Sequence, residues 1–466
     1  MQDKKVGTII LTAIIFSSMV GGGIFSIPQN IARTASLGAG IIAWLIASFG
    51  MFCIANVFIN LSKLRPNLNT GIYSYAENGF GKFIGFATGW SYLVCNYFVV
   101  ISLAVMSASA LDYFFPTYFT GGNNLLSVIC LSITIWIFNF IVLRGFKFSA
   151  TFNVIATILK FITLIIFIFV MLFVFDWSKF TLNFWGNNDI PIFKQITSSL
   201  LVTLWCFIGV ETGSTLSSEA KNQKIVSNST ILSFFMCLVL YIALSTVPYG
   251  FLTQEQIAKV PDPSAAGILE MVLGKYGAFI INLGVLIAIL SCWFSWILVL
   301  VEIPSKMAEN NNFPKQFLNK NKNGISYYST YLTSIIAQIG ILVAFFSSNA
   351  WIMMQSLSGV MIIPAYLFSS LYLIKIAKNS KLNVFFSLIS CIFLLLISYS
   401  CSIGYIVADF ILLVLAIPLF YLTHKNDNTK HIFTKNDKII SSVLIIIGIL
   451  AIFSLIFGFV KIPNLL

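Results

Sequence analysis

The stretch of sequence that decides the fold is MVGGGIF at residues 19–25, centred on Gly21-Gly22-Gly23. The triplet lies inside an apolar run, from Val6 to Ala35, that is long enough to cross a membrane. Each glycine in a helix costs roughly 1 kcal/mol relative to alanine, and lipid cannot hydrogen-bond an interrupted backbone. The triplet therefore predicts a membrane helix that is broken in order to bind a ligand, a device of secondary transporters.

The composition indicates a polytopic membrane protein. The 466 residues are 58% hydrophobic and 9% charged, with a mean hydropathy of +0.95. The net charge is +12, and nearly all of the charged residues lie in short loops between apolar runs. The charge therefore indicates the membrane topology of the chain, and we expect no nucleic acid partner. All eight cysteines fall inside apolar runs, which argues against a disulfide framework.

Thirteen apolar runs are long enough to span a membrane. They cover residues 6–35, 38–63, 81–115, 123–143, 147–175, 194–219, 226–252, 274–309, 329–348, 350–377, 383–402, 404–423 and 439–460. The runs 383–402 and 404–423 almost adjoin, which is compatible with a tight hairpin. A count of either twelve or thirteen spans stays open.

Loop charges predict a cytoplasmic amino terminus, because basic residues gather in cytoplasmic loops. The chain has 27 Lys and Arg residues, of which Lys160 lies inside a span. With this orientation the outer side receives only Arg33, Lys179, Lys194, Lys259, Lys275 and Lys461. The other loop cations fall on the inner side, and thirteen spans place the carboxyl terminus outside.

A second interruption lies in the sixth run, which reads LWCFIGVETG at residues 204–213. Interruptions five spans apart predict two units of inverted topology, with a site where the broken helices meet. We therefore expect an all-α integral membrane protein with a five-plus-five inverted-repeat transporter fold. Residues 6–175 form the first repeat, 194–377 the second, and 383–460 the additional helices of a single transporter domain, residues 1–466.

These residues resemble a known family. The stretch at residues 19–25, with Pro28 after it, resembles the first span of the amino acid–polyamine–organocation superfamily, and residues 204–211 resemble its sixth span. WILVLVEIP at residues 296–304 is similar to the arginine/ornithine branch of its basic amino acid/polyamine antiporters, which also include arginine/agmatine exchangers. The resemblance implies a multi-pass permease of the cytoplasmic (inner) membrane, surrounded by lipid, with homodimer formation left open.

The broken first span has two ends that suit an amino acid. The half that restarts near Gly23 offers free N–H groups and a positive helix dipole to a carboxylate, and the half that ends near Ser18 and Met19 offers carbonyls to an ammonium group. The resemblance implies the same assignment for Ser18, Gly22 and Gly23. An alternative is that the glycines only permit close helix packing.

Two tryptophans and a glycine complete the expected substrate site. A cationic side chain is attracted to an indole face by roughly 0.5–2 kcal/mol. The resemblance implies that Trp205 stacks on the substrate beside the break at Gly209 and that Trp296 closes the pocket. Helix packing or an interfacial position is the alternative for these tryptophans, and it is the preferred interpretation for Trp293.

Four further residues are candidates for coupling or gating. Glu211 inside a span marks a gate, a proton site or a partner of the substrate's distal cation, with a structural acid as the alternative. The resemblance implies that Lys160 replaces the sodium ion of sodium-driven relatives, unless it snorkels. Glu302 either lines the inner vestibule or pairs with Lys306. Tyr366 matches a gate position of the family.

The sequence lacks signatures of an enzyme, a cofactor or a metal site. The two histidines, His424 and His431, fit no common zinc spacing, and the glycine triplet follows no strand, which excludes a phosphate loop. The leading interpretation is an antiporter that exchanges a cationic amino acid, of the arginine, lysine or ornithine type, for a related amino acid or amine. A proton-coupled symporter of neutral amino acids is the alternative, followed by an amino acid sensor.

Overall fold

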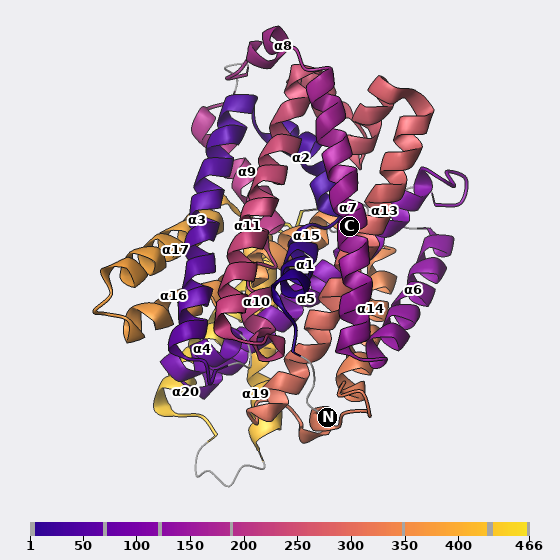
Figure 1. The fold of residues 1–466 in the computed structure, drawn as a ribbon. Coiled ribbons are helices and arrows are strands. Elements are labelled where there is room, and N and C mark those ends of the chain that lie inside the picture. Colours follow the sequence, from indigo (N-terminus) through magenta and orange to yellow (C-terminus); the bar gives the residue numbers. More distant parts are fainter. Residues whose placement is uncertain are drawn as a thin grey trace.

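Helices make up most of the computed structural model, which describes residues 5–68, 72–119, 124–186, 190–346, 350–425 and 432–463 (Figure 1). In these residues twelve helices are long and apolar enough to cross a membrane, and a bent pair at the amino terminus raises the number to 13. Two isolated β-bridges, Val6–Ala220 and Lys320–Ser326, are the only β-structure in this part of the chain. The protein is therefore a multi-pass membrane protein, as predicted.

The helices follow one another with short connections. They are α1 (Thr8–Met19), the 3₁₀ segment η1 (Gly22–Ser26), α2 (Ile27–Thr34), α3 (Leu37–Leu64), α4 (Ile72–Phe80), α5 (Lys82–Asp112), α6 (Leu125–Leu143), α7 (Phe146–Phe173), α8 (Trp177–Thr181), α9 (Ile192–Phe207), α10 (Thr212–Thr215), α11 (Gln223–Thr246), α12 (Gln254–Lys259), α13 (Ser264–Glu309), α14 (Tyr327–Ala344), α15 (Ala350–Met361), α16 (Ile363–Ile376), α17 (Lys381–Ser400), α18 (Ile403–Val414), α19 (Ala416–His424) and α20 (Lys435–Ile456).

The thirteen predicted runs all correspond to helices or broken pairs of helices. The first run is α1 followed by η1 and α2, with a bend of 45° between its halves, and the sixth contains the break between α9 and α10. The tenth run divides at Ile362, two residues before Pro364, because proline cannot donate the backbone bond of a helix interior. The predicted breaks in the first and sixth spans are confirmed.

Three short helices do not correspond to any of the predicted apolar runs. The helices α4, α8 and α12 are 9, 5 and 6 residues long, well below the length that a span requires. Helix α13 also starts ten residues before the predicted run, but Gly274 has a φ of 67° and divides it at the predicted start. The predicted boundary thus coincides with a real change of backbone direction.

The predicted hairpin between the eleventh and twelfth runs has the expected short connection. Only Cys401 and Ser402 separate α17 from α18. The two helices nevertheless pack on different neighbours, since α17 contacts α3, α9 and α16, whereas α18 contacts α15 and α20. The connection is tight, and it joins two different faces of the bundle.

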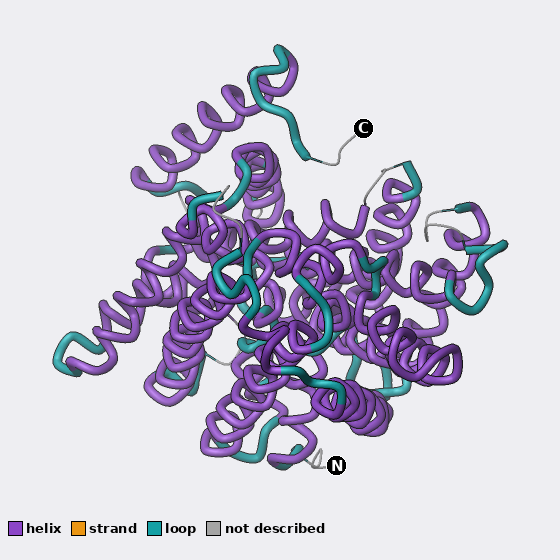
Figure 2. Tube along the Cα trace, turned by 90° about the horizontal axis from the view of Figure 1, so that it is seen from above, coloured by secondary structure: helices purple, strands orange, loops and turns teal. Residues whose placement is uncertain are grey.

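The broken helix α1 lies in the interior of the bundle. It packs against α7, α11 and α13, while α9 packs against α2, α3, α15 and α17 (Figure 1). The view from above shows α20 at the edge of the bundle, next to the carboxyl-terminal end (Figure 2). Helix α20 exposes Ile446, Ile449 and Leu450, as suits contact with lipid, whereas Leu11, Ile14 and Ile15 of α1 are fully buried.

Candidate functional site at two broken helices

The first break follows the last turn of α1. Val20 N–H still donates to Phe16 O at 2.8 Å, and the chain is then extended at Gly21, with φ of −102° and ψ of −164°. The 3₁₀ segment η1 begins at the next residue. The last carbonyls of α1 therefore lack partners in their own helix and must be satisfied by other groups.

Side chains from three other helices bind these carbonyls. Lys160 Nζ on α7 donates to Ser17 O at 3.2 Å and to Val20 O at 2.8 Å. Trp296 Nε1 on α13 donates to Ser18 O at 2.9 Å, and Tyr241 Oη on α11 donates to Met19 O at 2.9 Å. All four carbonyls from Ser17 to Val20 thus have a side-chain donor.

The second break lies directly against the first. After α9 ends, Gly209 adopts a φ of 114°, a conformation that side chains rarely allow. A Cβ at this position would lie 3.0 Å from the carbonyl carbon of Ser18 and 3.1 Å from the backbone nitrogen of Met19. Tyr241 Oη also lies 2.7 Å from Cys206 O, so its single proton is shared between the carbonyls at the ends of α1 and α9.

The indole of Trp205 covers the glycine triplet. A Cβ built on Gly23 would fall 2.2 Å from Cζ3 of Trp205, so only glycine fits beneath this ring. Trp205 Nε1 donates to Ser358 Oγ at 3.1 Å, and its ring meets Trp351 edge to face at 5.3 Å. The indole is thereby held by two residues of α15.

The cavity beside this indole is very small. Its volume is about 10 Å³, and its lining includes Ser18, Met19, Gly21, Trp205 and Trp296. This space accommodates about one water molecule and no amino acid. The structure therefore describes a closed conformation of the site.

A buried carboxylate ties the second break to two other helices. Glu211 is fully buried, and its Oε2 accepts hydrogen bonds from Gly209 N–H at 3.0 Å and from Tyr366 Oη at 2.5 Å. Its Oε1 accepts a hydrogen bond from Tyr92 Oη at 3.2 Å. In this conformation both carboxylate oxygens are engaged by donors of the chain itself, from α5, α16 and the break.

The buried ammonium of Lys160 faces hydroxyl groups as well as carbonyls. Nζ donates to Ser17 Oγ at 2.8 Å, and this hydroxyl lies 2.9 Å from the hydroxyls of both Ser291 and Ser295 on α13. Asn153 Nδ2 on α7 then donates to Ser295 Oγ at 2.5 Å. A continuous polar network therefore joins α1, α7 and α13 around one cation.

Comparison with known proteins identifies the family. The sequence model of the family described as "Amino acid permease" matches residues 6–411. The chain belongs to the amino acid permease family. The permease is 41% identical to the arginine/agmatine antiporter of Chlamydia pneumoniae over 480 residues, covering 99% of each chain. It is 42% identical to the antiporter of the same name from Chlamydia felis over 469 residues, covering 97% of this chain and 96% of the relative.

The permease brings most of the predicted site residues together. Ser18, Met19, Trp205, Gly209 and Trp296 meet at the two breaks, beside Gly23 and with Gly22 in η1. Lys160 contacts one side of the breaks, and Glu211 with Tyr366 contacts the other. The transport roles of these residues stay proposals.

Two alternatives from the sequence are wrong. Lys160 does not snorkel, since it is fully buried and its ammonium turns inward to α1. Lys306 Nζ lies 3.6 Å from Glu309 Oε2, and among the described residues it forms no ion pair with Glu302. Glu302 lies six residues beyond Trp296, about 9 Å further along α13, and takes no part in the cluster at the breaks.

Trp293, the cysteines and the histidines lie outside the cluster at the breaks or take no transport role in the sequence analysis. Trp293 is fully buried and packs edge to face on Phe138 at 5.2 Å, which confirms the packing interpretation. All eight cysteines are free. His424 Nδ1 lies 3.0 Å from Phe420 O, whereas His431 lies outside the described residues. Where the chain is described, no three His, Cys, Asp or Glu residues form a group that could hold a metal ion.

Sequence reasoning missed Tyr241, Ser358 and Trp351, which hold the breaks and the covering indole. Each lies inside an apolar run without a motif of its own. A buried tyrosine hydroxyl usually finds a partner, and this was the one available signal for Tyr241. Its partners, Met19 and Cys206, could not be inferred from its own run.

Proposed function

We propose that this permease exchanges a cationic amino acid of the arginine type for a related amino acid or amine by alternating access. The observation that carries the proposal is the direct contact of the two breaks, with Gly209 against Ser18 and Met19 and with Trp205 over Gly23. Such facing breaks supply carbonyls for an ammonium group and N–H groups for a carboxylate. The names of the relatives, which are arginine/agmatine antiporters 41–42% identical over nearly the whole chain, support exchange.

The closed site must open for a substrate to enter. Displacement of the Trp205 indole from Gly23 would expose the start of η1 to the substrate's carboxylate. The indoles of Trp205 and Trp296 would then offer π faces to the cationic part of the substrate. Lys160 would stand in the place of a coupling cation, so we propose that transport does not require sodium.

Counterflow in proteoliposomes tests the proposal. Vesicles preloaded with agmatine should take up labelled arginine at least about tenfold faster than empty vesicles do. Uptake into empty vesicles that is driven by a proton gradient would instead support the symporter of neutral amino acids. Binding of arginine with no uptake under either condition would support the sensor.

The finer features of assembly and location are also proposals. We infer that the protein lies in the inner membrane of a bacterium with a cytoplasmic amino terminus, and that it catalyses no reaction. Residues 6–175 and 194–377 are proposed as inverted repeats, with residues 383–460 as additional helices. A homodimer is proposed as the assembly, and light scattering of the purified protein tests it.

A further inference from the structure

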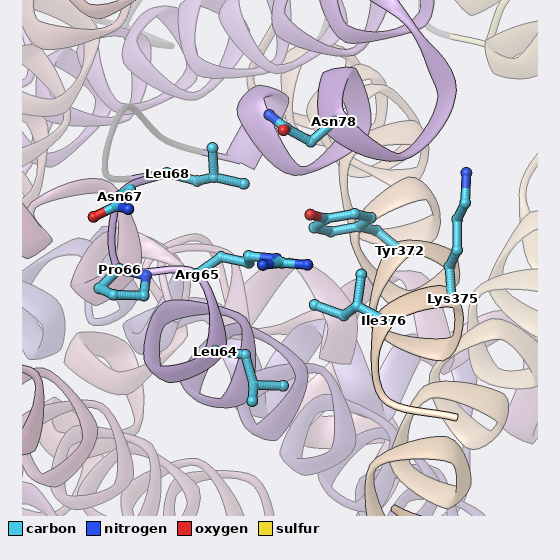
Figure 3. Close-up of a pocket in the computed structure, with 9 residues that line it drawn as sticks. All are labelled: Leu64, Arg65, Pro66, Asn67, Leu68, Asn78, Tyr372, Lys375 and Ile376. Carbon is cyan, nitrogen blue, oxygen red and sulfur yellow. The ribbon is translucent and has the colours of Figure 1, made fainter. Parts of the chain in front are cut away.

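A second cavity lies between the ends of α3, α4 and α16 (Figure 3). These helix ends are at the end of the bundle opposite α8 (Figure 1). The volume of the cavity is about 490 Å³, which would admit a ligand of about the size of a lipid headgroup. Its lining is formed by Leu64, Arg65, Pro66, Asn67, Leu68, Asn78, Tyr372, Lys375 and Ile376. The lining therefore contains two cations and no carboxylate.

Arg65 is the cation that is free to bind. It is exposed, and its guanidinium has no hydrogen bond or ion pair within the described part of the chain. Figure 3 shows Arg65 extending from the α3 side toward Tyr372 on α16. A guanidinium presents a planar set of donors that matches the oxygens of a phosphate group.

Lys375 adds a fixed positive charge to the same cavity. Its Nζ donates to Gly79 O at 2.7 Å and lies 5.7 Å from the centre of the Phe80 ring. The carboxylate of Glu77, on α4, accepts a hydrogen bond from Asn312 Nδ2 at 2.6 Å and forms no ion pair with Lys375 among the described residues. The charge of Lys375 is therefore not neutralised by this acid.

We propose that this cavity binds the phosphate group of an anionic phospholipid from the cytoplasmic leaflet. Arg65 holds the phosphate and Lys375 adds attraction. Asn78 Nδ2 donates to Ser74 O at 3.0 Å, which leaves its second N–H and its Oδ1 for the polar headgroup. Leu64, which is 47% exposed, and Ile376 form an apolar rim that a free phosphate ion would not use but a lipid would. The leaflet rests on the orientation proposed above, whereas the site itself does not depend on the transport reaction.

Native mass spectrometry of the purified full-length protein tests the site. Added phosphatidylglycerol should bind more tightly than phosphatidylcholine, and Arg65→Gln should weaken phosphatidylglycerol binding on the order of tenfold. The matched control is Lys63→Gln, which removes an exposed cation two residues away that does not line the cavity. Equal effects of the two variants, or none from Arg65→Gln, would overturn the proposal.

Inorganic phosphate and arginine separate the remaining explanations. Arg65-dependent binding of inorganic phosphate, without a preference for phosphatidylglycerol over phosphatidylcholine, would overturn the lipid in favour of a soluble ligand. Arginine binding at the breaks, measured by calorimetry in detergent, should be the same in Arg65→Gln and the parent. Failure of the lipid site and failure of the proposed exchange are therefore observed separately.

Discussion

At the scale of single residues, two glycines at the breaks are required for different reasons. Gly209 needs a positive φ of 114°, and any side chain there would also press on the end of α1. Gly23 lies beneath the Trp205 indole, where the space for a Cβ is already filled. Substitution at Gly23 therefore acts on the neighbouring ring and, through it, on the closed state of the site.

We expect Gly23→Ala to abolish or strongly weaken arginine binding while the protein remains folded. The added methyl group would meet Trp205 at 2.2 Å in the closed site, and in the open site it would hold the substrate's carboxylate away from the N–H groups at the start of η1. The matched control is Gly7→Ala at the start of the same span, where a Cβ would have nothing within 4 Å. Calorimetry on monodisperse protein is the measurement, and undiminished affinity would reduce the triplet to a packing feature.

Glu211→Gln tests whether the buried acid carries a proton or contacts the substrate. The glutamine keeps the shape of the acid, because its oxygen can accept from Gly209 N–H and Tyr366 Oη while its amide nitrogen donates to Tyr92 Oη, a hydroxyl that can also accept. We expect arginine affinity to persist, exchange to slow and the pH profile of transport to flatten. Loss of arginine affinity at every pH would show instead that the carboxylate pairs with the substrate's cation.

At the scale of elements, the end of α1 is held by three helices that are distant in the chain. Lys160 comes from α7, Tyr241 from α11 and Trp296 from α13. A helix end inside a membrane needs such donors, because no water is available to its free carbonyls. The same bonds also position the break, so that each of these side chains is a structural support of the candidate site.

Tyr241→Phe should loosen the two breaks without unfolding the protein. The lost hydroxyl contacts Met19 O and Cys206 O, whereas the ring still packs on Trp44 and Phe207. We expect the free energy of unfolding to fall by about 0.5–1.5 kcal/mol. The affinity for arginine should fall as well. Tyr249→Phe is the control, since the buried Tyr249 hydroxyl has no hydrogen-bond partner among the described residues and its loss should lower neither quantity. Equal behaviour of the two variants would refute a positioning role for Tyr241.

Lys160→Met should destabilise the link between α1 and α7. The methionine keeps the apolar stem but leaves Ser17 O and Val20 O without their charged donor, at a cost of roughly 1.5–3 kcal/mol. We expect a lower melting temperature and little exchange, whereas Lys63→Met at the exposed end of α3 should resemble the parent. Replacement of sodium by choline should not alter exchange by the parent, and a strong sodium requirement would contradict the proposed role.

At the scale of the whole molecule, the two ends of the bundle differ in charge. The end of α3, with Lys63 and Arg65, and the start of α20, with Lys435 and Lys438, lie at the end of the bundle opposite α8 (Figure 1). This distribution agrees with the predicted cytoplasmic side. With the proposed orientation, the end with Arg65 and Lys375 would face the anionic cytoplasmic leaflet.

A reporter fused after Leu466, which lies outside the described residues, should be external. Thirteen spans and a cytoplasmic amino terminus require this placement. A second reporter in the connection after α3 should be cytoplasmic and serves as the control. A cytoplasmic signal from the first reporter would mean that one candidate span does not cross the membrane, with the tightly connected α17 and α18 the first to re-examine.

The sequence by itself determined the membrane class, the approximate spans and the positions of both breaks. These properties depend on local patterns, namely the length of an apolar run and the low helix propensity of adjacent glycines. It also singled out Lys160 and Glu211, because a charged group inside a membrane span needs a partner. Trp205 was singled out by its place before the second break and by the family resemblance. Short helices such as α4 were missed because their length and polarity carry no comparable signal.

The tertiary structure alone decided which groups meet. Trp296 and Ser18, which share a hydrogen bond, are 278 residues apart, and Lys160 and Ser17 are 143 residues apart. No local periodicity carries information about such pairs, since they result from how whole helices pack. The same reason explains why Tyr241 emerged as the link between the two breaks and why Glu302 proved to lie outside their cluster.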